Sequence, residues 1–234
     1  KENDINLYYQ SREDSTNHKK TCRISPKSTF VLNPKLSTSK ETAMGQEQPD
    51  PELFRRLDKL LKVYIAEIGT ALGLKGDNHR LLMIGYGLAF EGHKYAPNRE
   101  SGEPYIMHPF RQFRRISIRM LKFGVVSPDF IRLTLLIILL HDTVEDALKG
   151  KILPFVAYSK ICTLLDELTA YCVLTLTKKK FETKEDETRK EFLERVLRSE
   201  LWMVFVAKPE DMIDNLTTLN ALPFEKQPGK VREA

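Results

Sequence analysis

The chain has 234 residues, of which 41% are hydrophobic and 29% are charged, and its formal net charge is +5 at pH 7. This size and composition favour one soluble domain with a single sizeable core. The longest purely apolar stretch, Leu135 to Leu140, is far too short to span a bilayer, and no signal-peptide core lies near the N-terminus, which argues against a membrane protein.

Residues 1–48 are rich in Ser, Thr, Lys and Asn and show no hydrophobic periodicity. A segment of this kind cannot bury enough apolar surface to order itself, so we predict a disordered tail. The first residue is Lys1 rather than Met, and Met44 is an alternative start, so the chain is expected to be a fragment or to carry an artefactual leader. The sequence stops at Ala234 inside a predicted helix, which suggests a truncated C-terminus.

From residue 49 to residue 234 the pattern is helical and predicts one all-α domain. Asp50-Pro51 is a good cap and first-turn pair for a helix that carries leucines at helix spacing as far as Ile68. Asp77 is expected to cap a second helix that ends near His93. A third helix should run from about residue 105 to residue 123.

Ser127-Pro128-Asp129 should open a fourth helix, which carries the apolar run that ends at Leu140. Because this helix is apolar on nearly every side, we predict that it is the central buried helix. Further helices are expected near 154–178, 185–205 and 208–220. No alternating strand pattern competes with them, so the predicted fold is an all-α bundle.

His141-Asp142, followed by Glu145-Asp146, stands at the end of that apolar run. The four-residue spacing predicts that His141 and Glu145 share one helix face and that Asp142 and Asp146 share another. Charged groups are costly to take out of water unless they are paired or bound to a cation. The motif therefore predicts a metal site with acid/base groups beside it.

Two further motifs flank the central one, at residues 98–109 and 207–216. Together the three motifs resemble the Rel/Spo family of guanosine tetraphosphate (ppGpp) hydrolases, whose hydrolase domain belongs to the HD superfamily. The family reads approximately R-K-S-G-E-P-Y-I-x-H-P, then H-D-x-V-E-D, then K-x-A-D-x-x-x-N. The resemblance covers roughly residues 78–232 and implies an HD-domain helical bundle.

The resemblance also implies roles for individual residues. The family's metal ligands match His108, His141, Asp142 and Asp211, and its usual metal is manganese (one Mn²⁺ ion). The pair that activates water and assists the leaving group matches Glu145 and Asp146. Positions that bind the nucleotide match Arg99, which would stack on guanine, and Ser101, Lys208, Asn215 and Thr218. The implied substrate is a small-molecule nucleotide, and the intact pair of acids favours a working hydrolase.

Three positions depart from the family pattern: Glu100 replaces a lysine, Asp214 a common histidine and Ala147 a threonine. Two added negative charges should weaken the binding of a polyphosphate unless they face away. The departures therefore leave open an HD-type phosphohydrolase of another nucleotide. A non-catalytic nucleotide sensor is a further alternative, although a sensor has no need of Glu145 and Asp146.

Other features of the sequence concern location and partners. Cys22, Cys162 and Cys172 lack CxxC spacing and predict free thiols in a reducing compartment, hence a cytoplasmic protein. Basic residues are spread along the predicted helices, so no nucleic-acid partner is expected. We interpret His93 as a packing residue and Trp202 as part of a core stripe. The sequence does not predict the oligomeric state.

Overall fold

In a computed structural model of the chain, the described residues are 51–94, 96, 98–99, 101–124, 127–145, 154–178 and 187–221, with the single positions 225, 227, 228 and 231. The predicted disordered tail, residues 1–48, lies outside them. So do Glu100, Asp146 and Ala147, so the structure does not test the interpretations placed on these positions.

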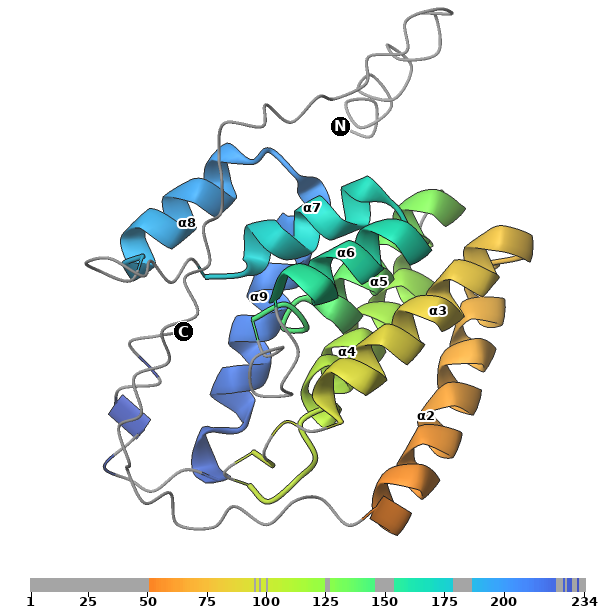
Figure 1. The fold of residues 1–234 in the computed structure, drawn as a ribbon, viewed down its shortest axis with the longest axis horizontal. Coiled ribbons are helices and arrows are strands. Elements are labelled where there is room, and N and C mark those ends of the chain that lie inside the picture. The colour runs from red at the N-terminus through yellow and green to blue at the C-terminus, as the bar shows by residue number, and fades with distance from the viewer. Residues whose placement is uncertain are drawn as a thin grey trace, which may run out of the picture. The chain divides into compact units, whose positions relative to one another are not determined.

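The secondary structure of the described residues is helical, and no strand occurs among them, which confirms the all-α prediction. The α-helices are α2 (Pro51–Ala71), α3 (Gly76–His93), α4 (Met107–Phe123), α5 (Pro128–Leu140), α6 (Pro154–Leu164), α7 (Glu167–Leu176), α8 (Arg189–Arg198) and α9 (Trp202–Thr217) (Figure 1). A short 3-10 helix, η2 (Leu219–Ala221), follows α9.

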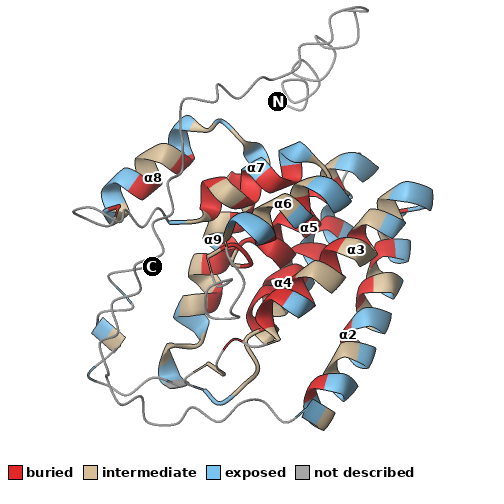
Figure 2. Cartoon of the chain, in the orientation of Figure 1, coloured by how far each residue is buried: buried red, intermediate tan, exposed pale blue. Residues whose placement is uncertain are grey.

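Helix α5 is the centre of the bundle, as its apolar sequence predicts. It packs against α3, α4, α7 and α9, and each residue from Leu133 to Leu140 is buried (Figure 2). The helix begins as expected, with Pro128 in its first turn and the Ser127 hydroxyl accepting a hydrogen bond from the backbone N–H of Phe130 at 3.5 Å. No helix in the described part of the chain is both long and apolar enough to cross a bilayer.

Several predicted helix boundaries are wrong. The segment near 154–178 is two helices, because the Asp166 side chain accepts a hydrogen bond from the Thr169 N–H at 2.6 Å and starts α7. The second error lies near residue 200, where Glu200 has a positive φ of 54° and separates α8 from α9. Helix α9 then continues through Pro209, since its packing against α4 and α5 outweighs the lost amide donor.

Trp202 is the first residue of α9 and is 70% exposed, so its interpretation as a core residue is wrong. The buried residues of α9 lie further along the helix, where it contacts α5. Cys172 is buried in the core, and Cys162 is partly buried against it. His93 is also buried, and its ring stacks on the Tyr105 ring at a centroid distance of 5.0 Å.

The close packing of α3 against α5 is testable with two glycines in one helix. A Cβ at Gly85 would lie 2.1 Å from Leu136 Cδ2, whereas a Cβ at Gly87 would meet nothing within 4 Å. We expect Gly85→Ala to lower the free energy of unfolding by about 1–3 kcal/mol through overpacking. Gly87→Ala, the matched control, should raise it by roughly 0.5–1 kcal/mol because alanine favours the helix. Denaturant titration measures both, and equal effects would contradict this packing.

Candidate metal centre

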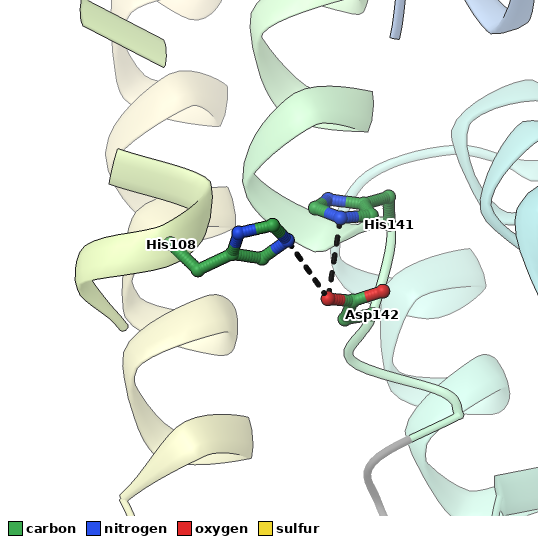
Figure 3. A group of neighbouring side chains, drawn as sticks. All are labelled: His108, His141 and Asp142. Atoms are coloured by element: carbon green, nitrogen blue, oxygen red, sulfur yellow. Dashed lines mark ion pairs between the residues drawn. The ribbon is translucent and has the colours of Figure 1, made fainter. Parts of the chain in front are cut away.

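Residues from separate parts of the sequence meet where α4, α5 and α9 contact one another. His108 lies in the first turn of α4, His141 and Asp142 directly follow α5, and Asp211 lies in α9. The side chains of His108, His141 and Asp142 point toward one another and offer a group of ligand atoms that could hold a metal ion (Figure 3). His108 and Asp211 are 103 positions apart in the sequence but within hydrogen-bonding distance.

Both imidazoles approach the same two carboxylate oxygens. The Nε2 atoms of His108 and His141 lie 3.4 and 3.2 Å from Asp142 Oδ2 (Figure 3). They lie 3.1 and 3.7 Å from Asp211 Oδ1. Two neighbouring ligand atoms about 2.1 Å from one cation are roughly 3.0–3.5 Å apart. The spacing of His108 and His141 from Asp142 therefore suits ligands that share one metal ion, whereas Asp211 meets this spacing with His108 and lies further from His141.

The other ring nitrogen of each histidine is already engaged. His141 Nδ1 lies 2.8 Å from the Ile138 carbonyl oxygen, which can only accept, so Nδ1 carries the proton. His108 Nδ1 lies 2.7 Å from the Asp214 carboxylate and donates to it. The Nε2 lone pairs of the neutral rings therefore face the carboxylates. His141 Nε2 is buried and has no hydrogen-bond partner among the described residues, as expected of a ligand atom.

The carboxylates strongly favour positive charge on the two rings. Burial alone would lower the pKa of His108, but hydrogen bonds to Asp142, Asp211 and Asp214 outweigh it and raise the pKa to about 9. For His141, burial again lowers the pKa, but the charge of Asp142 and hydrogen bonds to Asp142 and Asp211 together raise it well above its usual value. The pKa of Asp142 and of Asp211 is held well below its usual range, since the imidazoles overcome the effect of burial. The site thus attracts protons or a metal cation.

The prediction that His141 and Glu145 share a helix face is wrong. Helix α5 ends at Leu140, and residues 141–145 form turns, the first closed by a hydrogen bond from the Thr143 N–H to the Leu140 carbonyl at 2.8 Å. The His141 ring binds the Ile138 carbonyl, which the backbone N–H of Asp142 would bind if the helix continued. This hydrogen bond from the His141 side chain to the backbone occurs where the helix ends. The turn that follows brings the side chains of His141 and Asp142 to the same site.

The candidate acid/base residue Glu145 lies in the same turn segment. One of its carboxylate oxygens accepts a hydrogen bond from the backbone N–H of Lys178, just beyond α7, at 3.4 Å. Its partner in the predicted pair, Asp146, lies outside the described residues. The turn itself fits tightly against α3, because a Cβ at Gly92 would lie 2.7 Å from the Thr143 methyl carbon.

Three of the predicted nucleotide-binding residues come together beside the metal centre. The Arg99 guanidinium donates to Asn215 Oδ1 at 3.0 Å and to the Thr218 hydroxyl at 3.4 Å. Asn215 in turn donates to Asp211 Oδ1 at 2.9 Å, so this group is linked directly to the metal centre. Lys208 also reaches the centre, with its ammonium 2.7 Å from Asp211 Oδ2.

Ser101, the remaining predicted nucleotide-binding residue, takes no part in the hydrogen bonds described above. It is exposed, in a turn closed by a hydrogen bond from the Gly102 N–H to the Arg99 carbonyl at 2.7 Å. Gly102 has a φ of 82° there, a conformation that favours glycine. The turn therefore places Ser101 on the same loop as Arg99, at the surface.

Asp214 has a role that the sequence did not reveal. It is completely buried, and its carboxylate accepts hydrogen bonds from His108 Nδ1 at 2.7 Å, Arg111 at 2.7 Å and Arg115 at 2.8 Å. Burial would raise the pKa of Asp214, but these partners hold it far below its usual range. The expectation that Asp214 weakens phosphate binding does not apply, since its charge is paired beneath the site.

The sequence does contain a signal for this support. Arg111, Arg115 and Arg119 recur every four residues on α4, and Glu210 and Asp214 are four residues apart on α9. Arg115 also donates to Glu210 at 3.0 Å, and Arg119 binds the same carboxylate. Two helices with complementary charges at this period can pair along their length, and this pairing sets α4 and α9 in register at the metal centre.

Gln112 is a further buried group that sequence reasoning missed. Its amide nitrogen lies 2.9 Å from His108 Nε2, while its amide oxygen has no hydrogen-bond partner among the described residues. Gln112 lies one helical turn after His108 on α4, so the two side chains meet as helix neighbours. It is therefore the side chain that would compete with a cation for the Nε2 lone pair.

Comparison with known proteins adds no assignment: no protein-family model matches the chain, and no solved structure matches it significantly.

The hydrogen bond between Asp214 and His108 should determine metal affinity. We expect Asp214→Asn to weaken Mn²⁺ binding by about ten- to a hundredfold, because an amide orients and polarises the imidazole less well than a carboxylate. Calorimetric titration of the metal-stripped protein measures the change. Glu67→Gln, which removes an exposed carboxylate on α2, is the control. Unchanged affinity in Asp214→Asn would show that Asp214 serves only the arginines.

The raised pKa of His108 predicts that metal affinity increases with pH, whereas the stability of the metal-free protein decreases. Metal must displace the proton from Nε2, so we expect Mn²⁺ affinity to increase with pH up to about 9. Without metal, the folded-state pKa exceeds the unfolded value of about 6.5. The corresponding stabilisation is complete below that value and is lost as pH rises through about 9. Titrations and denaturation curves between pH 6 and pH 9 test both trends, and a pH-independent affinity would contradict the first.

Proposed function

We propose that this protein is a metal-dependent phosphohydrolase that acts on guanosine tetra- and pentaphosphate (ppGpp and pppGpp). The reaction would remove the 3′-diphosphate as pyrophosphate and leave GDP or GTP. The observation that carries the hydrolase proposal is the convergence of the buried His108 and His141 with the partly buried Asp142. The choice of substrate rests on the resemblance to the Rel/Spo family.

The proposed ligands are His108, His141, Asp142 and Asp211, and the proposed ion is Mn²⁺. Two imidazoles and two carboxylates suit a divalent ion of intermediate hardness, whereas structural zinc sites more often use thiolates. When bound, the ion would polarise the phosphorus–oxygen bonds of the substrate and lower the pKa of a neighbouring water molecule. Lys208 beside Asp211 would place a second positive charge near the phosphates.

Arg99 and Asn215 are the proposed nucleoside-binding residues. Arg99 is 17% exposed at its side chain and is fixed by Asn215 and Thr218, so its guanidinium has a defined plane on which a guanine base could stack. Because Asn215 also binds Asp211, the base-binding group and the metal ligands keep a fixed separation. Such an arrangement would present the reacting phosphate in a constant orientation.

Glu145 is the proposed group that orients or deprotonates the attacking water, together with Asp146. The hydrogen bond from the Lys178 N–H restricts one Glu145 carboxylate oxygen, and a carboxylate held in this way could take a proton from the attacking water. A cytoplasmic location and the absence of a nucleic-acid partner complete the proposal, on the evidence of cysteine spacing and charge distribution.

An HD-type phosphohydrolase of another nucleotide is the second candidate. The two charge departures motivated it, but Asp214 is buried and paired with arginines, which removes one of the two. Glu100 remains the other and lies outside the described residues. A non-catalytic nucleotide sensor has less support, because a sensor does not need an acid/base residue such as Glu145.

Purified, metal-stripped protein should be tested with Mn²⁺ against ppGpp, GTP, NADPH and simple phosphate esters, with release of pyrophosphate or phosphate as the readout. We expect pyrophosphate from ppGpp. Asp211→Ala should lose bound metal and activity together, whereas Glu145→Gln should keep metal and lower kcat by roughly two to four orders of magnitude. Preferential hydrolysis of another nucleotide would favour the second candidate, and nucleotide binding without turnover the sensor.

A further inference from the structure

The peptide group between Thr177 and Lys178 makes hydrogen bonds at both of its ends. Its carbonyl oxygen, on Thr177, accepts a hydrogen bond from the Arg195 guanidinium at 2.9 Å. Its N–H, on Lys178, donates to the Glu145 carboxylate at 3.4 Å. A single planar peptide therefore connects a cation on α8 to the candidate acid/base residue, and its orientation is set from both sides.

This peptide lies at the C-terminal end of α7, where the last carbonyls give a helix partial negative charge. A carboxylate such as Glu145 is disfavoured at that end of a helix. Arg195 removes the conflict, because it binds the Thr175 carbonyl at 2.7 Å as well as the Thr177 carbonyl. The exposed partial charge of α7 is thereby neutralised at the point where Glu145 approaches.

Arg195 is itself held firmly in place. Its guanidinium forms two hydrogen bonds with the largely buried Glu187 carboxylate, at 2.7 and 2.9 Å, and lies 5.3 Å from the Phe192 ring centroid. The same ring is approached by the Lys208 ammonium at 5.1 Å, and Lys208 pairs with a proposed metal ligand. Helix α8 thus reaches the candidate site at two points. Phe192 lies beside Lys208, which pairs with the proposed ligand Asp211, and Arg195 binds the peptide that donates to Glu145.

We propose that Arg195 is a positioning residue for Glu145. Through the Thr177–Lys178 peptide it fixes the hydrogen-bond donor that holds the Glu145 carboxylate, and it cancels the helix-end charge that would repel this carboxylate. The inference rests on the proposed function for its catalytic meaning. The physical link between Arg195 and Glu145 does not depend on that function, so the two can be tested separately.

The link can be measured by NMR through the backbone amide of Lys178. Glu145→Gln should shift the Lys178 amide proton, because a carboxylate acceptor is replaced by a neutral amide. In an Arg195→Lys background this shift change should be clearly smaller, since lysine keeps the charge but cannot bind two carbonyls and a carboxylate with one planar fork. A shift change of the same size in both backgrounds would overturn the proposal.

Kinetics then test the catalytic meaning. Arg195→Lys should lower kcat by roughly ten- to a hundredfold, with KM and Mn²⁺ affinity unchanged. In a Glu145→Gln background the same substitution should cause no further fall, because the two residues act as one unit. Additive effects on kcat would overturn the positioning role. Arg198→Lys is the matched control, since Arg198 is an exposed arginine on the same helix and should change nothing.

The tests remain decisive if a variant fails to fold or if the parent protein is inactive. If Arg195→Lys fails to fold, as judged by circular dichroism, Arg195→Met takes its place in both measurements, because its side chain can still pack on Phe192 without any hydrogen bond. If the parent protein hydrolyses no nucleotide, the proposed function fails, and the Lys178 shift still decides whether Arg195 positions Glu145.

Discussion

The candidate site depends on an electrostatic conflict that a positive charge would relieve. The Nε2 lone pairs of His108 and His141 and the oxygens of Asp142 and Asp211 face one another away from water. Such atoms repel unless a proton or a metal ion lies among them. The rings cannot avoid the conflict by exchanging tautomers, because their Nδ1 atoms already donate to acceptors outside the group.

The conflict exists because α5 is a buried helix that ends inside the bundle. At an exposed helix end His141 and Asp142 would be in contact with water, and the free energy of their interaction would be small. Here the apolar residues of α5 bind it to α3, α4, α7 and α9, and α4 and α9 bring the remaining groups to its C-terminus. Hydrophobic burial therefore supplies the free energy that holds these polar groups together.

The sequence predicts the parts of this arrangement that depend on local pattern. The apolar run of α5 and the motif containing His141 are of this kind, and the structure places both as expected at the centre of the bundle. The helix end at Leu140 and the break at Glu200 were missed, because each depends on a local hydrogen bond or backbone angle that hydrophobic periodicity does not contain. The charge spacing on α4 and α9 indicates that these helices pair, but the hydrogen bond from His108 to Asp214 depends on how they pack and is not contained in either local pattern.

Helix α9 combines a cation-binding side with groups suited to anions. Asp211 Oδ1 faces the imidazoles and also accepts a hydrogen bond from Asn215, one turn after it, while Asp211 Oδ2 binds the Lys208 ammonium, one turn before it. Arg99 adds a second positive charge through its hydrogen bond to Asn215. The inward carboxylates therefore favour a cation, and the basic groups around them favour an anion. Because one helix carries both functions, a shift of α9 would alter metal binding and anion binding together.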